Sequence, residues 1–372
     1  MRGGKEMRKE IETDLLVVGG GAAGLCAAAE AGRAGAKVTV IESDLHAGGQ
    51  LVKQTHKFFG SKDEYAGTRG YKIADILMEE IESLGDKVEI RTNTTVTGYY
   101  PEEGIYTAMC GEDEYYRIKA KKAVIATGAQ ERLIPFPNND LPGVYGAGAV
   151  QTLMNVYGVV PGKRVLMVGA GNIGLIVSYQ LRQAGVEIAA VVEAMPKIGG
   201  YWVHAAKIRR LGIPILLRHT ITEALGDKII EGAVIQELDD KFQPIGQPRE
   251  IECDVICMAV GLTPTTELFW QAGAKMLYCP QLCGHVPYRD ETMRTSHPDI
   301  WVAGDAAGIE EASAAMVEGR IAGHSAAKAL GYPVKEEAFK QYWSRLDHLR
   351  AGEVGEKIRG GICQVIVKGW EA

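Results

Sequence analysis

The chain has 372 residues, of which 46% are hydrophobic and 24% are charged, a composition that excludes fibrous and disordered proteins and fits two to three globular domains. Lys and Arg total 41 against 47 Asp and Glu, a formal net charge of −6, and the absence of a basic stripe argues against a nucleic-acid binder. Glycine is in excess, with 46 residues, about 12% against a usual share of about 7%, which points to tight turns and to backbone that approaches a ligand.

Targeting and redox signals are weak. Residues 1–14 have no apolar core of a signal peptide, and no run of about 18 apolar residues occurs, so we expect no membrane span and a cytoplasmic protein. The cysteines are odd in number, scattered and without a CxxC, which suits a reducing compartment and argues against a metal site. They are Cys26, Cys110, Cys253, Cys257, Cys279, Cys283 and Cys363.

The first predicted unit is a nucleotide-binding βαβ fold. Residues 14–18 (DLLVV) read as a buried strand, the glycines Gly19, Gly21 and Gly24 follow with GxGxxG spacing, and a helix-forming run comes next. The strand predicted at 37–41 ends at Glu42. In this motif the glycines permit a tight turn, close approach of a pyrophosphate and close helix packing, while the acid binds ribose hydroxyls.

The same arrangement recurs about 150 residues later. The strand in RVLMV leads to Gly169, Gly171 and Gly174, a helix follows, and EIAAVVE ends at Glu193, 19 residues after Gly174. An acid at this place favours NAD(H), because it repels a 2′-phosphate. The nearest cations that could contradict this preference fit solvated helix faces better; they are Arg182, Arg209 and Arg210.

Two later strands complete the pattern. KAVIATGAQ (122–130) ends in Ala126-Thr127-Gly128, and TSHPDIWVAGDAAG (295–308) runs into Gly304-Asp305 before a long helix-forming stretch. With these strings the chain resembles the flavoprotein disulfide-reductase-like superfamily with two dinucleotide-binding domains. The resemblance implies an α/β protein with two Rossmann-like FAD/NAD(P)-binding domains, the NAD domain being inserted into the FAD domain. The expected FAD domain covers 11–139 and 286–372, and the NAD domain 140–285.

The resemblance also implies which residues contact each cofactor. The expected FAD contacts are Gly19, Gly21, Ala22, Ala23, Gly24, Glu42, Gly49, Gln50, Thr127, Gly128, Gly304 and Asp305. The expected NAD contacts are Gly169, Gly171, Asn172, Ile173, Gly174, Glu193 and, in the closing string MAVGLTPTTEL, Gly261. No metal ligand and no general acid or base is expected, since hydride transfer between the cofactors needs neither. Lys53 and His56 are open between a flavin-side role and an ordinary loop position.

A redox cysteine pair is missing from the positions where disulfide reductases carry one, so disulfide reduction by an internal thiol relay is not expected. The role of Cys279 and Cys283 stays open. The strings ATGAQERLIPFPNNDLPGVYGAGAVQTLMNVYGVVPGKRVLMVGAGNIG and GHVPYRDETMRTSHPDIWVAGDAAG are similar to the FAD/NAD subunits of sarcosine and opine oxidases, hydrogen cyanide synthase and heteromeric proline dehydrogenases.

That group implies an FAD- and NAD(H)-dependent subunit of a hetero-oligomer that acts beside a second flavoprotein subunit oxidising an amine or amino acid. The single tail cysteine cannot ligate an iron–sulfur cluster, so a [2Fe–2S] cluster is expected on a separate protein. The amphipathic stretch AFKQYWSRLDHL covers either the chain's own FAD domain or a partner. The rival interpretations are a stand-alone NADH oxidase or diaphorase and a non-catalytic nucleotide-binding structural subunit.

Overall fold

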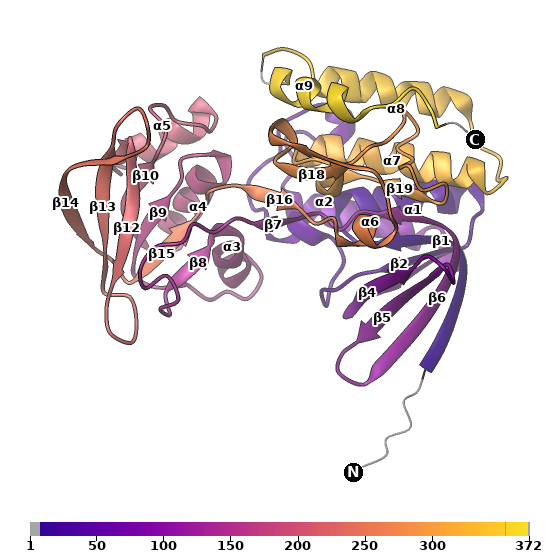
Figure 1. Cartoon of the computed structure of the whole chain (residues 1–372), viewed down its shortest axis with the longest axis horizontal. Coiled ribbons are helices and arrows are strands. Elements are labelled where there is room, and N and C mark those ends of the chain that lie inside the picture. Colours follow the sequence, from indigo (N-terminus) through magenta and orange to yellow (C-terminus); the bar gives the residue numbers. More distant parts are fainter. Residues whose placement is uncertain (1–7, 354, 371–372) are drawn as a thin grey trace, which may run out of the picture. The chain divides into compact units, whose positions relative to one another are not determined.

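A computed structural model describes residues 8–353 and 355–370 and divides the chain into two compact units. Unit 1 holds the described residues up to Gln130 and from Thr263 onward, and unit 2 is Glu131–Leu262. The second unit is therefore inserted into the first (Figure 1).

Unit 1 is built on a seven-stranded sheet in the order β3-β2-β1-β6-β5-β4, with β19 also paired to β6. Strands β3, β2, β1, β6 and β19 run parallel, whereas β4, β5 and the first half of β6 form an antiparallel meander. The strands are β1 (Arg8–Val18), β2 (Val38–Ile41), β3 (Val88–Arg91), β4 (Thr94–Tyr100), β5 (Ile105–Cys110), β6 (Glu114–Ile125) and β19 (Ile300–Val302). Both β1 and β6 end where their partners Val18 and Ile125 lie side by side, so the loops after them emerge at one edge of the sheet.

The helices of unit 1 include a tightly packed pair, α1 and α7. A Cβ at Gly319 or Gly323 of α7 would overlap the carbonyl oxygen of Ala23 or Ala27 of α1, so glycine lets the two backbones approach closely. Helix α7 also packs against α8 (Figure 1). The remaining elements of this unit are α1 (Ala22–Ala34), η1 (Gly49–Lys53), η2 (Lys62–Glu64), α2 (Gly70–Glu82), η3 (Gly85–Lys87), α6 (Glu267–Gln271), β17 (Met276–Cys279), η4 (Pro280–Leu282), β18 (Gly284–Pro287), η5 (Gly304–Ala307), α7 (Ala312–Ala329), α8 (Glu336–Leu349) and α9 (Glu356–Val365).

Unit 2 repeats this plan with a parallel sheet in the order β11-β10-β9-β15-β8 and an antiparallel meander β12-β13-β14. Its elements are β8 (Val144–Gly146), α3 (Ala147–Asn155), β9 (Arg164–Val168), α4 (Asn172–Gln183), β10 (Glu187–Glu193), α5 (Trp202–Arg210), β11 (Ile215–Leu217), β12 (His219–Leu225), β13 (Gly232–Leu238), β14 (Pro244–Glu252) and β15 (Val255–Met258). The predicted α/β class with two Rossmann-like sheets is thus confirmed.

Alternation along the strands of unit 2 explains its two cores. Val165 and Met167 of β9 pack in the cluster that includes helix residues such as Leu175, while Leu166 and Val168 pack in the cluster that includes meander residues such as Ile235. Successive strand residues face opposite sides of a sheet, so helices cover one side of this sheet and the meander covers the other.

The unit boundaries lie at other residues than the domain limits expected from the sequence. Residues 131–139 fall in unit 2 and residues 263–285 in unit 1. Phe136 is buried in the meander core of unit 2, and the backbone oxygen of Pro137 accepts a hydrogen bond from Ala224 N. Phe269 is buried in the core of unit 1. The chain crosses between the units within β7 (Ala129–Glu131) and β16 (Leu262–Pro264), which pair with each other.

The amphipathic stretch of α8 lies on its own unit. Phe339, Tyr342 and Trp343 are partly buried against the core of unit 1, and Trp343 Nε1 donates a hydrogen bond to the backbone oxygen of Glu291 at 3.0 Å. Among residues 8–353 and 355–370, no helix has the length and apolar character needed to cross a membrane. The same described residues contain no group of three or more His, Cys, Asp or Glu arranged to hold a metal ion.

Candidate functional site

The first glycine loop follows β1 and is set by steric contacts. Gly19 has a φ of 103°, a value that favours glycine, and a Cβ there would overlap the carbonyl oxygen of Ala126, just after β6. A Cβ at Gly24 would overlap the carbonyl oxygen of Gly19. At Gly21, by contrast, φ is −79° and the nearest atom to a Cβ is the Cα of Gly49 at 3.9 Å. The fold needs the outer glycines, whereas the middle one leaves space at the start of α1.

That space lies at the amino end of α1, which has the properties of an anion site. The helix begins at Ala22, no side chain caps it, and its first turn carries no acidic residue. The first N–H groups of a helix have no partners within the helix, and the helix dipole is positive at this end. These groups fit a pyrophosphate, the anion of a dinucleotide.

Glu42 is buried beside the same loop, with an exposed fraction of 5%. Its Oε2 accepts a hydrogen bond from Gly20 N at 2.7 Å, and its Oε1 accepts one from Asp44 N at 2.7 Å. The carboxylate is therefore held by backbone donors at the end of β2, the place where a ribose would be bound in this fold.

The segment 48–56 forms another wall of this site. Gly48 N donates a hydrogen bond to the backbone oxygen of Gly20 at 2.7 Å, and a Cβ at Gly49 would lie 2.8 Å from the Cα of Gly21. Gln50 is exposed on η1, whereas the ring of His56 stacks on Phe58 with a centroid distance of 5.4 Å. Gly49 is thus brought to the predicted pyrophosphate position.

Thr127 and Gly128 join β6 to the returning chain. The Thr127 hydroxyl donates a hydrogen bond to the backbone oxygen of Thr265 at 2.7 Å, and Thr265 N donates one to the backbone oxygen of Gly128 at 3.0 Å. Thr127 therefore has a structural partner in addition to its predicted place beside a cofactor.

Gly304 and Asp305 lie next to the start of α1. Gly304 has a φ of 70°, and a Cβ there would lie 2.8 Å from the Cβ of Ala23. Burial raises the pKa of Asp305 to about 7, and the carboxylates of Glu318 and Glu310 act in the same direction. A carboxyl with this pKa is largely protonated below neutral pH and can then donate a hydrogen bond as well as accept one.

The second glycine loop, in unit 2, reproduces the first. Gly169 has a φ of 110°, and a Cβ there would overlap the carbonyl oxygen of Ala259, just after β15. A Cβ at Gly174 would overlap the carbonyl oxygen of Gly169, whereas a Cβ at Gly171 would have no atom within 4 Å. Helix α4 begins with no side-chain cap and no acid in its first turn.

The acid of the second loop is held as in the first. Glu193 accepts hydrogen bonds from Ala170 N at 2.8 Å and from Met195 N at 2.9 Å. Around it, Asn172 and Ile173 differ in environment: Asn172 Oδ1 accepts a hydrogen bond from Tyr201 N at 2.7 Å, and Ile173 is 37% exposed. The predicted Gly261 has a φ of 114° and its backbone oxygen accepts a hydrogen bond from Arg132 N at 2.9 Å, in the segment before the chain returns to unit 1.

A second glycine pair was missed by the sequence interpretation. Gly199 and Gly200 follow Glu193 by the same spacing with which Gly48 and Gly49 follow Glu42. Gly200 N donates a hydrogen bond to the backbone oxygen of Ala170 at 2.9 Å, and a Cβ at Gly200 would lie 2.9 Å from the carbonyl carbon of Gly171. The repeated spacing from acid to glycine pair was the signal that could have found them.

The cysteines do not form a redox pair in the positions used by disulfide reductases. Cys26, Cys253 and Cys257 are buried, and burial raises the pKa of Cys253 to about 11 and that of Cys257 further still. Cys279 is also buried, and its thiol lies 3.4 Å from Gln281 Oε1. High-pKa buried thiols are poor nucleophiles.

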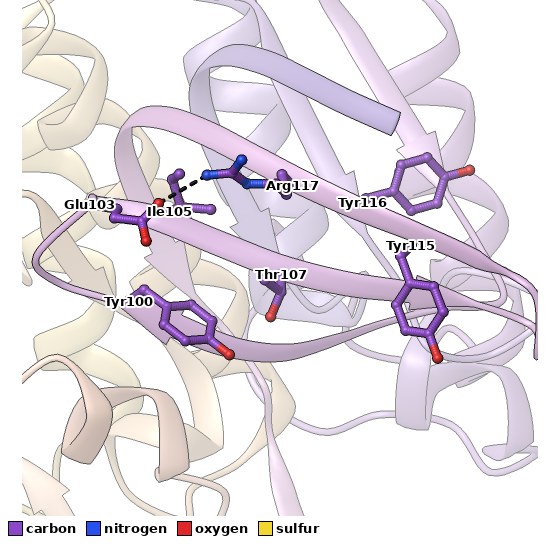
Figure 2. Close-up of a pocket in the computed structure, with 7 residues that line it drawn as sticks. All are labelled: Tyr100, Glu103, Ile105, Thr107, Tyr115, Tyr116 and Arg117. Atoms are coloured by element: carbon purple, nitrogen blue, oxygen red, sulfur yellow. Dashed lines mark hydrogen bonds and ion pairs between the residues drawn. The ribbon is translucent and has the colours of Figure 1, made fainter. Parts of the chain in front are cut away.

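A surface pocket of about 540 Å³ lies on the meander of unit 1 (Figure 2). Its lining residues are Tyr100, Glu103, Ile105, Thr107, Tyr115, Tyr116 and Arg117. Tyr115 pairs with Arg8 at the start of β1, whereas Gly19 follows Val18 at its end. Ten strand residues rise roughly 33 Å, so this pocket is separate from the nucleotide loops.

Comparison with known proteins gives concordant results. The family model for pyridine nucleotide-disulphide oxidoreductases matches residues 13–319. The chain is 28% identical to the alpha chain of sarcosine oxidase from Corynebacterium sp. (strain P-1), over 87% of this chain and 33% of that protein. It is 28% identical to the larger-than-matched opine oxidase protein of Agrobacterium tumefaciens (strain Ach5), over 83% of this chain and 64% of that one.

A further relative, the hydrogen cyanide synthase component HcnB of Pseudomonas aeruginosa, is 27% identical over 95% of this chain and 78% of its own length. The chain thus spans about a third of the sarcosine oxidase protein and somewhat under two thirds of the opine oxidase protein.

Solved structures share the fold. L-proline dehydrogenase from P. horikoshii superposes with a TM-score of 0.72 at 24% identity, covering 92% of this chain and 60% of that one. T. acidophilum thioredoxin reductase does so with 0.69 at 23% identity, covering 86% and 98%. With its two glycine loops, the chain belongs to the pyridine nucleotide-disulphide oxidoreductase family and is an FAD-dependent oxidoreductase with FAD and a pyridine nucleotide as cofactors.

Proposed function

We propose that unit 1 binds FAD, that unit 2 binds NAD(H), and that the chain exchanges hydride between them as one subunit of a heteromeric amine or amino-acid dehydrogenase. The observation that carries this proposal is the duplication of one loop geometry. In both units an open middle glycine, Gly21 or Gly171, lies at an uncapped helix start, and a buried or half-buried acid, Glu42 or Glu193, is held by the loop backbone.

The assignment of each cofactor rests on how far each loop is covered within its own unit. Ala23 is 7% exposed because Gly304 and Gly319 pack against it. Ile173, at the matching position of unit 2, is 37% exposed. An enclosed loop suits a cofactor that stays bound, and an open loop suits one that must leave after each turnover.

The residues assigned to FAD are the ones that meet at the first loop, together with the strand ends beside it. They are Gly19, Gly21, Ala22, Ala23, Gly24, Glu42, Gly49, Gln50, Thr127, Gly128, Gly304 and Asp305. The residues assigned to NAD(H) are Gly169, Gly171, Asn172, Ile173, Gly174, Glu193 and Gly261, to which the structure adds Gly199 and Gly200 as candidates.

The bound cofactors supply the hydride chemistry, and the protein supplies binding and orientation. Backbone N–H groups at the starts of α1 and α4 would hold the pyrophosphates. The Glu193 carboxylate would accept hydrogen bonds from the ribose hydroxyls and repel a 2′-phosphate, which favours NAD(H) over NADP(H). No side chain is assigned as a general acid or base.

The proposed setting is a hetero-oligomer. The relatives named above are subunits of sarcosine oxidase, opine oxidase and hydrogen cyanide synthase, and this supports two partners, a separate [2Fe–2S] protein and a second flavoprotein subunit. The substrate class that fits these names is an amine or an amino acid, and the scattered cysteines favour the cytoplasm.

Anaerobic titration of the purified flavoprotein tests the hydride exchange. We expect NADH to bleach the flavin absorption and NADPH to do so far more slowly. Absence of bleaching by either nucleotide would remove the hydride-exchange proposal and favour a structural nucleotide-binding subunit. Rapid turnover of NADH with oxygen or a quinone by the single chain would favour a stand-alone oxidase or diaphorase, whereas co-purification with an amine-oxidising flavoprotein would support the heteromer.

A further inference from the structure

A buried group of charges lies directly behind the Gly304-Asp305 segment. It consists of Arg289, Glu310, Glu318 and Arg350, in which Arg289 and Glu318 are each 2% exposed and Arg350 is 5% exposed. These two arginines and two glutamates balance in charge. Such groups are costly to bury and are tolerated when each is paired and hydrogen-bonded.

Arg350, the residue that follows α8, connects both glutamates. Its Nη2 donates to Glu318 Oε1 at 2.6 Å and to Glu310 Oε2 at 2.6 Å, and its Nε donates to Glu310 Oε1 at 2.8 Å. A planar guanidinium can hold two carboxylates in one fixed geometry, which a lysine ammonium cannot do.

The two glutamates in turn hold the two ends of the segment that contains Asp305. Glu318 Oε2 accepts a hydrogen bond from Gly304 N at 3.0 Å, and Glu310 N donates one to Asp305 Oδ1 at 3.4 Å. One guanidinium therefore supports the residue before Asp305 and the residue that contacts its carboxyl.

Other contacts keep this support rigid. Arg289 Nη1 donates to the backbone oxygen of Ala307 at 3.0 Å, at the end of η5. Arg359 of α9 donates to the backbone oxygens of Arg350 and, at 3.0 Å, of Gly352. The position of Arg350 is thus fixed by the carboxyl-terminal helices, far along the chain from the first glycine loop.

We infer that Arg350 is a positioning residue for the flavin site, acting through Glu310 and Glu318 to hold Gly304 and Asp305 against the start of α1. This inference rests on the proposed function, in which Asp305 contacts FAD. It makes the carboxyl-terminal helices α8 and α9 part of the cofactor site, although neither supplies a residue that would touch the cofactor.

The test measures FAD binding and flavin spectra rather than turnover. Deflavinated wild-type protein, Arg350→Met and Arg350→Lys are titrated with FAD, and the visible band shape and the midpoint potential of the bound flavin are recorded. We expect the dissociation constant to rise at least about tenfold in R350M and by about threefold in R350K, since charge-assisted hydrogen bonds are lost in each. We also expect a changed band shape or potential.

Arg345→Met is the matched control. Arg345 lies on the same helix α8, and its Nε donates to the buried Glu64 at 2.6 Å, so R345M also removes a buried ion pair without touching residues 304–318. We expect R345M to lower the thermal stability of the apoprotein but to leave FAD affinity within twofold and the flavin spectrum unchanged. Equal FAD loss in R345M and R350M would overturn the positioning role.

Two further outcomes separate the inference from its premise. Asp305→Ala should weaken FAD binding by at least about tenfold if Asp305 contacts the cofactor; unchanged binding would refute that part of the proposed function. Weak binding in D305A together with wild-type binding and spectra in R350M would refute the role of Arg350 alone. If R350M does not fold, the comparison of R350K with Arg345→Lys decides in the same way.

Discussion

The pair of substitutions Gly171→Ala and Gly174→Ala tests the second nucleotide loop, because the two glycines are three residues apart and have opposite surroundings. A Cβ at Gly171 has no atom within 4 Å, and φ there is −73°. A Cβ at Gly174 would overlap the carbonyl oxygen of Gly169 and lie 3.2 Å from the Cβ of Ala259. The first change should therefore act on a ligand and the second on the fold.

The magnitudes follow from these contacts. For G171A, alanine is a poorer helix N-cap than glycine by roughly 0.5–1 kcal/mol, and the loss of freedom in the unfolded chain returns roughly 0.4–1 kcal/mol. The free energy of unfolding should thus change little. For G174A, backbone must shift to admit the methyl group, and such overpacking destabilises by about 3 kcal/mol, which lowers the Tm by roughly 10 °C.

Binding should show the opposite order. A methyl group at residue 171 stands where backbone N–H groups would approach a pyrophosphate, and each charge-assisted hydrogen bond lost costs roughly 1.5–3 kcal/mol. NADH affinity, measured by fluorescence titration of the flavoprotein beside a calorimetric melt, should fall about 10- to 100-fold in G171A. Wild-type NADH affinity in G171A, or destabilisation as large as that of G174A, would refute the assignment of this loop.

Three further predictions use the same logic. Replacement of Glu193 by Gln should reduce the preference for NADH over NADPH by about tenfold in paired affinity measurements; an unchanged preference would show that another group sets it. Because the raised pKa of Asp305, about 7, means that the folded apoprotein holds its proton longer than the unfolded chain, stability should fall as the pH rises from about 4 to about 7, by roughly 4 kcal/mol in all, and urea unfolding of D305N should lack this fall. Gly323→Ala should destabilise by about 2–3 kcal/mol, since its Cβ would overlap the backbone oxygen of Ala27, whereas Gly360→Ala on α9, with no atom within 4 Å, should change stability by no more than about 1 kcal/mol; equal melts of the two variants would contradict the close packing of α1 and α7.

The glycine loops were predictable from the sequence because their requirements are local. Gly19 and Gly169 need a positive φ, and Gly24 and Gly174 need the absence of a Cβ against a carbonyl five residues earlier. A requirement of this kind leaves a fixed spacing in the sequence wherever the fold occurs. The glycine pair Gly199-Gly200 obeys a spacing too, but it becomes visible only when the two halves of the chain are aligned on Glu42 and Glu193.

The limits of the units were harder to predict, because composition does not say where a loop packs. The segment 131–143 is rich in Pro, Asn and Gly and so has the composition of a linker. Phe136 nevertheless enters the core of unit 2, and Pro142 O accepts a hydrogen bond from Ile230 N. The charges behind Asp305 were beyond sequence reasoning for a related reason: Arg350 meets Glu310 at a separation of 40 residues, and no local pattern marks such a pair.

The two sites differ in how much of the chain must fold to make them, and this gives each cofactor a different effect on stability. The second loop is built from one stretch, residues 164–200, so its nucleotide would stabilise unit 2 alone. The first loop needs Gly304 beside Ala23 and, through Glu318, the support of Arg350. A ligand that binds only the folded state stabilises everything its site requires. FAD should therefore hold both ends of the chain together, which accounts for why an enclosed site for a permanent cofactor is built from segments so distant in sequence.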